Sequence, residues 1–286
     1  MQSQTENHTI YYYADEEQFT VSPELYNLDI TVSKHKISML VFQSGAVVAL
    51  KYIEYKHNLF ETPAAINNLA NELAWHNLGF NHIRLIVDSP VFSLVPEPLF
   101  DANKAEDYLT LIHQTPQPLH TAYHKTGKHQ SVLVWALSAG VFNTLQQVFK
   151  PALTLHNVQV FLDNGFKIQA SQMVNQLLVH YTPDMITVGY LLQQEIKYLN
   201  TFTIDADTDM IYYLISVAAQ LKLQEQKFGI VLMGEFSSNS ASLPLMKKYI
   251  PHVQLMKRWP DITYPEALRT LPEHQQFLNS HSLVCE

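Results

Sequence analysis

Cysteine is almost absent from this chain, which has 286 residues and one cysteine, Cys285. A single thiol excludes an intrachain disulfide and a cysteine-rich metal site. Long apolar runs are missing too: the longest have the length of a strand, well short of the roughly 20 residues that span a bilayer. The segment Met1–Tyr13 has no basic stretch followed by an apolar one, so we expect no signal peptide. These absences favour a soluble cytoplasmic protein.

Charge is also scarce. Charged residues make up 15% of the chain, and 26 acidic residues against 18 basic ones leave a net charge of −8. Such a chain is a poor match for the phosphate backbone of a nucleic acid or for an anionic membrane. No run of basic residues offsets this balance. We therefore expect an unidentified protein partner, no nucleic acid and no membrane span.

Three consecutive strands are predicted within Leu25–Lys56. In the first of them Leu28, Ile30 and Val32 lie on one face and Asp29 and Thr31 on the other. A helix follows, beginning at Thr62-Pro63 because threonine can cap free N–H groups and proline suits the first helical position; Gly79 is the predicted stop. The predicted strands of this unit are 25–33, 37–43, 47–55 and 82–88.

The same order returns after residue 172, with three strands within 173–204, a helix at 205–223 and a strand at 228–233. Two matching units indicate an internal duplication. A compact α+β piece at about 91–150 is inserted between them, with strands at 91–95, 119–124 and 131–137 and helices at 103–113 and from Ser138. We expect a loose tail at 1–21, a first lobe at 22–155 and a second lobe at 156–286. The second lobe begins with a short helix at 157–166. It ends with a helix to Ile250, a strand at 253–256 and a short helix from Pro265.

This order resembles the actin-like ATPase fold, which is related to ribonuclease H. The inserted piece resembles the small insertion of the bacterial division actin and of cytoplasmic proteins of pilus assembly and type II secretion. Local segments resemble a bacterial family of unknown function assigned to that fold. These segments are Tyr26–Val32, Phe92–Phe100, Asn200–Tyr213 and Leu232–Gly234. The resemblance implies an α/β protein with duplicated ribonuclease-H-like lobes and a small α+β insertion.

In actin-like ATPases the first turn of each three-strand unit wraps the nucleotide phosphates, and glycine lets backbone N–H groups approach them. Here the two turns are Val32–Lys36 and Tyr181–Met185. Neither contains glycine, and Pro183 removes a donor. The resemblance places Ser33, Thr182, Gly234 and Glu235 at the ligand cleft between the lobes. We expect a degenerate, non-catalytic binding or scaffold module without a cofactor; an ATP–Mg²⁺ switch with weak or no hydrolysis is the alternative.

A further alternative is a ribonuclease-H-like phosphodiesterase. It would need carboxylates clustered around metal ions, and Asp29, Glu72 and Asp88 come in a suitable order. The competing interpretation is a half-exposed strand aspartate, a solvated helix glutamate and a turn-capping aspartate. Asp29 also precedes the first turn by four residues, which places it poorly for holding Mg²⁺ near a phosphate.

Three histidines lie on a predicted hairpin. His120 and His124 share a face, and the hairpin can bring His129 opposite them, so all three are candidate metal ligands. No acidic or cysteine ligand is near them in sequence, and a solvated set of histidines is the competing interpretation. Tyr11–Tyr13, Trp259 and the polar loop Ser237–Ser242 are candidates for a partner surface.

Overall fold

The computed structural model describes residues 2–4, 8–14, 17–114, 118–126, 131–171, 176–193, 195–223, 228–237, 239–240, 242–250 and 252–275. The chain forms two compact units. Unit 1 contains residues 1–159 and 261–268, and unit 2 contains residues 160–260 and 269–286. Within the described residues, no helix has the length and apolar character needed to cross a bilayer.

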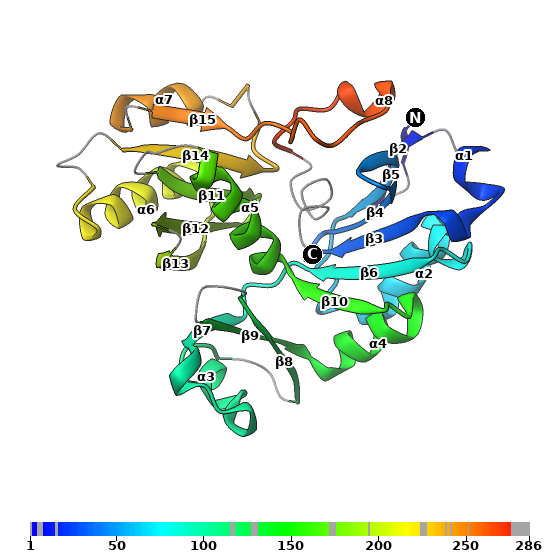
Figure 1. The fold of residues 1–286 in the computed structure, drawn as a ribbon, viewed down its shortest axis with the longest axis horizontal. Helices are drawn as coiled ribbons and strands as arrows, with labels where there is room; N and C mark the ends of the chain where they lie inside the picture. Colours follow the sequence, from blue (N-terminus) through cyan, green and yellow to red (C-terminus); the bar gives the residue numbers. More distant parts are fainter. Residues whose placement is uncertain are drawn as a thin grey trace. The chain divides into compact units, whose positions relative to one another are not determined.

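The main sheet of unit 1 is built on an antiparallel meander (Figure 1). Its strands are β1 (Gln2–Gln4), β2 (His8–Ala14), β3 (Asn27–Val32), β4 (Lys36–Gln43), β5 (Ala46–Tyr55), β6 (His82–Val87) and β10 (Leu153–His156). Their order across the sheet is β1-β2-β5-β4-β3-β6-β10. β6 pairs in parallel with β3, and β10 in parallel with β6. The predicted meander is confirmed, whereas β10 was not predicted.

The N-terminal segment belongs to this sheet, and the prediction of a loose tail is wrong. β2 pairs antiparallel with β5 from His8 to Ala14. Its aromatic residues make the contact favourable: the Tyr11 ring stacks on Tyr52 with 4.6 Å between centroids, and Tyr12 meets Trp75 edge-on. Aromatic pairs across strands stabilise a sheet beyond the area they bury. The short helices α1 (Glu17–Thr20) and η1 (Pro23–Leu25) lead into β3.

Two helices, α2 (Pro63–Leu73) and α4 (Ala139–Phe149), pack against each other and beside the sheet. The helix α2 begins at Pro63 as predicted, but the Thr62 side chain makes no capping hydrogen bond and donates to Asn58 instead. It ends at Leu73, before the predicted stop at Gly79, because the next residue, Ala74, adopts a left-handed φ of 64°. The short turn η2 (Trp75–Asn77) follows. Ser138 caps α4 by accepting from the Val141 N–H, as predicted.

The insertion is a three-stranded antiparallel sheet of β7 (Phe92–Pro96), β8 (Leu119–Lys125) and β9 (Ser131–Ser138), in the order β7-β9-β8. One face carries a small core of Val95, Val132, Val134 and Leu109. Leu109 lies on α3 (Asp107–Thr110). The predicted helix at 103–113 is broken, because η3 (Glu97–Leu99) and η4 (Ala102–Lys104) precede α3 and Asp101 caps the second of them.

Unit 2 repeats the topology of unit 1. Its strands are β11 (Gln176–Thr182), β12 (Met185–Leu192), β13 (Glu195–Thr203), β14 (Gly229–Gly234) and β15 (His252–Leu255), in the order β13-β12-β11-β14-β15. This order matches β5-β4-β3-β6-β10: a meander, then two parallel strands on the side of its first strand. The predicted duplication of the βββαβ order is therefore present in the strand pairing.

The helices of unit 2 bury its sheet. Their bounds are α5 (Asn157–Ser171), which is longer than predicted and begins in unit 1, α6 (Asp207–Gln220) and α7 (Ser242–Tyr249). The short helix α8 (Glu266–Arg269) lies mostly in the unit 1 segment 261–268. Apolar residues of α6 pack against the β11 side chains Leu177 and Val179. Asp209 accepts from the N–H groups of Asp205 and Ala206 at 3.0 Å, which fixes the start of α6.

Candidate functional site

The first turn, between β3 and β4, is tied to the chain that follows β5. The Ser33 N–H donates to the Lys36 carbonyl at 2.9 Å, which closes the turn. The carbonyl of Lys34 accepts from the Leu59 N–H and that of His35 from the Tyr55 N–H, both at 2.7 Å. The turn is therefore held by its own backbone against residues 55–59.

The second turn, between β11 and β12, is closed by a side chain. The Thr182 hydroxyl lies 3.3 Å from the Asp184 carboxylate and 3.1 Å from the Met185 carbonyl. The Asp184 carbonyl accepts from the Ile204 N–H at 3.0 Å. The Thr182 hydroxyl, a predicted ligand-binding group, is thus engaged inside the turn.

Gly234 is the last residue of β14, and its backbone lies very close to that of Tyr181 beside the second turn. Its φ is +98°, and a Cβ at this position would lie 2.2 Å from the Tyr181 carbonyl oxygen. The Gly234 N–H donates to the His274 carbonyl and the Glu235 N–H to the Tyr181 carbonyl, each at 2.8 Å. These two N–H groups already have protein acceptors, so the glycine serves the approach of two protein segments.

Asp207, at the start of α6, joins the second turn to the loop before α7. Its carboxylate accepts hydrogen bonds from the hydroxyls of Tyr181 at 2.9 Å, of Ser240 at 2.8 Å and of Ser242. Burial raises the pKa of Asp207, but the three hydroxyl donors outweigh it and hold the pKa below its ordinary value. The sequence shows an acidic helix start and a serine-rich loop, and only the fold brings them together.

These contacts test whether a magnesium nucleotide fits. A phosphate-binding turn needs N–H groups directed at the anion. Here the turns contain no glycine, and the N–H groups of Gly234 and Glu235 donate to the protein itself. In the part of the chain that the structure describes, no three His, Cys, Asp or Glu side chains are placed to hold a metal ion. In this arrangement, the predicted ligand residues Ser33, Thr182, Gly234 and Glu235 do not fit a magnesium nucleotide.

The three carboxylates of the phosphodiesterase alternative are not brought together. Asp29 is 2% exposed rather than half-exposed, and it receives two hydrogen bonds from Arg84, at 2.9 and 2.6 Å. Glu72 lies 2.7 Å from the His8 ring. Asp29 pairs in register with Leu40 and thereby with Leu50, so it lies on the sheet face opposite to Lys51, which contacts α2. Glu72, on α2, is therefore across the sheet from Asp29.

Asp88 follows β6 and is 4% exposed, with its N–H donating to the Val32 carbonyl. A two-metal site needs carboxylates around shared ions. Asp88 forms no such group with Asp29 and Glu72, all three of which the structure describes.

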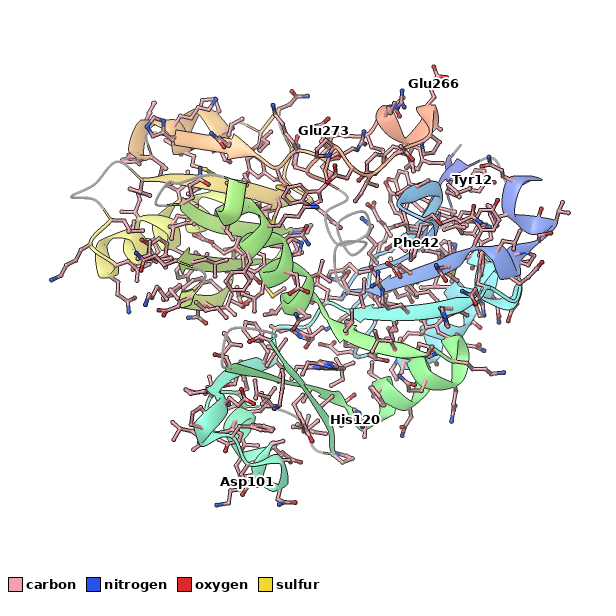
Figure 2. All side chains as sticks on the ribbon, in the orientation of Figure 1. Tyr12, Phe42, Asp101, His120, Glu266 and Glu273 are labelled. Carbon is pink, nitrogen blue, oxygen red and sulfur yellow. The ribbon has the colours of Figure 1, made fainter. Side chains whose placement is uncertain are left out.

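The hairpin histidines do not converge either. His120, labelled in Figure 2, lies on β8. Its ring stacks on that of Phe142, with 3.4 Å between ring centroids. His124 lies four residues along the same strand, about 13 Å away at about 3.3 Å per residue. One ion cannot bridge that distance, and burial lowers the pKa of both rings. His129 is outside the described residues.

Comparison with known proteins identifies the family. The family described as "Protein of unknown function (DUF3822)" matches residues 15–253. The chain belongs to this family. No curated protein matches the sequence.

Two solved structures show which fold this DUF3822 member has. One is a protein from Bacteroides thetaiotaomicron with an actin-like ATPase fold and unknown function: TM-score 0.78, 17% identity, covering 93% of this chain and 98% of the other. The second is the PilM–PilN type IV pilus biogenesis complex: TM-score 0.65, 10% identity, covering 92% and 98%. The predicted actin-like ATPase fold is confirmed. At these identities the likeness shows the fold alone.

A buried cluster in this DUF3822 protein was not predicted. His156, at the end of β10, is fully buried, and its ring centroid lies 5.5 Å from that of the buried Trp135. The His156 Nδ1 accepts from the Val158 N–H at 3.3 Å, so Nε2 carries the proton of the neutral ring. Burial, and to a smaller extent the nearby His124, lower the pKa of His156 to about 3, although a backbone hydrogen bond at Ser89 raises it. The parallel pairing of β10 with β6 positions the His156 ring, and no sequence pattern predicts that position.

Acidification is expected to destabilise unit 1 through His156. Its pKa is about 3 in the folded protein and 6.5 in the unfolded chain, so the unfolded chain binds the proton first. This contribution to stability is complete above about pH 6.5 and falls as the pH drops towards 3, by a total on the order of 5 kcal/mol. Urea unfolding between pH 7.5 and 4.5 measures the slope. His156→Gln should flatten it, whereas His82→Gln, at an exposed position, should leave it unchanged; equal slopes in all three proteins would contradict this assignment.

Proposed function

We propose that this protein is a cytoplasmic, non-catalytic actin-like module that binds or scaffolds a protein partner. One observation carries the proposal: the donors that would face a nucleotide are engaged within the protein. The Gly234 and Glu235 N–H groups donate to the carbonyls of His274 and Tyr181, and Thr182 closes its own turn. A fold does not determine an activity, and these contacts favour a degenerate nucleotide site.

The insertion supports a role in partner binding. Leu99, Leu111 and Ile112 expose 70%, 82% and 65% of their surfaces, and Tyr123 is also exposed. All four belong to the insertion, where Phe100 contacts both Tyr108 and Tyr123. Exposed apolar side chains that gather on one small element are typical of interaction surfaces. The PilM neighbour, which has the same fold, was solved in a complex with PilN.

Thermal unfolding in the presence of ATP and Mg²⁺ tests the proposal. A ligand that binds only the folded protein stabilises it by about 2.7 kcal/mol at a hundredfold excess over its Kd. We expect no concentration-dependent rise of Tm up to about 1 mM ATP–Mg²⁺, where a site with a Kd of about 10 μM would be nearly saturated. Phosphate release should also equal that of buffer alone.

Two outcomes would decide against the proposal. A saturable rise in Tm without phosphate release would make the protein a nucleotide-binding switch. A rise accompanied by turnover would make it an ATPase. Magnesium chloride without ATP is the control for general salt effects on stability.

A further inference from the structure

Unit 2 contains a cavity whose described lining includes one predicted site residue, Trp259. Its volume is about 710 Å³. It is bounded by Ile168 of α5, Val231 of β14 and the segment that follows β15. That segment contributes Met256, Lys257, Arg258 and Trp259. All of its described lining residues belong to unit 2.

Two glycines let the helix α5 pack closely against the sheet of unit 2. A Cβ on Gly165 of α5 would lie 2.5 and 2.8 Å from the methyl groups of Leu178 and Leu191. A Cβ on Gly189 of β12 would lie 2.7 Å from the Phe161 ring. The helix α5 is therefore in close contact with the middle of the sheet. The cavity opens beside β15, the last strand in the sheet order, where α5 reaches its final turn at Ile168.

The aromatic wall of the cavity is held in a defined position. The Trp259 indole N–H donates to the Asn164 side-chain oxygen at 2.7 Å, and the Asn164 amide donates to the Val160 carbonyl at 2.7 Å. Asn164 is fully buried. The Lys167 ammonium lies 4.3 Å from the centre of the Trp259 ring. The Asn164 nitrogen is thus held by its own helix and its oxygen holds the indole, which preorganises the aromatic wall for a ligand.

The charge around the cavity is opposite to that of the chain. Lys257 and Arg258 line it, and Lys167 lies on its aromatic wall, while none of its described lining residues is acidic. Arg258 donates to the Leu271 carbonyl at 3.0 Å, which fixes its guanidinium. In a chain with a net charge of −8, this concentration of positive charge favours an anion.

We infer that the cavity binds a small organic carboxylate with an apolar body. The cations come from the segment after β15, whereas apolar side chains come from α5 and β14, so the ligand would need one charged end and one apolar end. A volume of 710 Å³ lies within the range of about 300–1,000 Å³ that small-molecule pockets occupy. The inference uses no group of the two turns, so it stands or falls separately from the proposed function.

Calorimetric titration with naphthalene-2-acetate tests the inference, with naphthalene-2-acetamide as the neutral ligand of the same shape. We expect a Kd of about 100 μM for the acid, in keeping with the efficiency of ligands of this size. The amide should bind at least about fivefold more weakly, because it lacks the charge that Lys257 and Arg258 attract. Lys257→Gln should weaken the binding of the acid by a similar factor and leave the affinity for the amide unchanged.

The matched control is Lys247→Gln, an exposed lysine on α7 that loses the same charge outside the cavity lining. It should bind the acid like the parent protein. Both lysines are exposed, so neither variant threatens folding. Equal affinities for acid and amide, equal effects of the two lysine variants, or no heat with either compound at about 2 mM would each overturn the inference. Binding of an acidic peptide without binding of the acid would assign the cavity to a protein segment and overturn it as well.

Discussion

Gly234→Ala is expected to lower the free energy of unfolding by at least about 4 kcal/mol. The new methyl group would lie 2.2 Å from the Tyr181 carbonyl oxygen, far inside the shortest contact that a Cβ tolerates. The obstacle is backbone, which belongs to a sheet pairing and cannot rotate away. The left-handed φ of +98° adds a further cost for any residue with a Cβ. Urea unfolding followed by circular dichroism measures the loss.

Two other glycines separate these causes. Gly79→Ala keeps a positive φ, +85°, but meets no atom within 4 Å, so it should lose only about 1–2 kcal/mol. Gly140→Ala, in helix α4 and with open space around it, should be neutral or stabilise by up to about 1 kcal/mol. If Gly234→Ala lost no more stability than Gly79→Ala, the contact with Tyr181 would not be the reason for glycine at this position.

Replacing Asp29 by asparagine is expected to cost about 3–5 kcal/mol of stability. The side chains of Asp29 and Arg84 are 1% and 16% exposed, and they share two hydrogen bonds. Without the carboxylate, the largely buried guanidinium loses the negative charge of Asp29 and the good geometry of both hydrogen bonds. Chemical denaturation of Asp29→Asn measures this loss, which would mark Asp29 as a structural partner of Arg84.

The double replacement Asp29→Leu with Arg84→Met is the control for this pair. It removes both charges and keeps the volume, and such exchanges are often neutral or stabilising. We expect the double variant to be about 2–4 kcal/mol more stable than Asp29→Asn, and a double-mutant cycle with both single replacements gives the coupling energy. A double variant no more stable than the single one would show that packing at Asp29 matters more than charge.

The burial of Asp29 is a feature that the sequence alone does not predict. The alternation of β3 correctly separates Asp29 and Thr31 from Leu28 and Ile30, because side chains alternate across a strand. It predicts a half-exposed aspartate. The register of β3 with β6, 55 residues later, sets Asp29 beside Arg84 and buries it. The local residue pattern of a strand does not predict which distant strand it will pair with in parallel.

The N-terminal segment was misjudged for a similar reason. A polar stretch with a few tyrosines looks like a tail when it is read alone. Its stability comes from β5, where Tyr52 receives the Tyr11 ring. The strand β10 was missed because it has four residues and lies between two helices. Short strands gain their stability from neighbours rather than from their own composition.

By itself, the sequence determined the two βββαβ units, the inserted sheet and the absence of glycine from both turns, since strand alternation, helix starts and turn residues are local properties of the chain. Only the tertiary structure decided what the candidate groups do. It directed the Gly234 and Glu235 N–H groups to His274 and Tyr181, and it placed Asp207 among three hydroxyls. It also set Trp259 against Asn164, 95 residues away, beside a cavity. Contacts of this range follow from how sheets and helices pack, because hydrogen bonds between distant segments form only once the buried surfaces have brought them together.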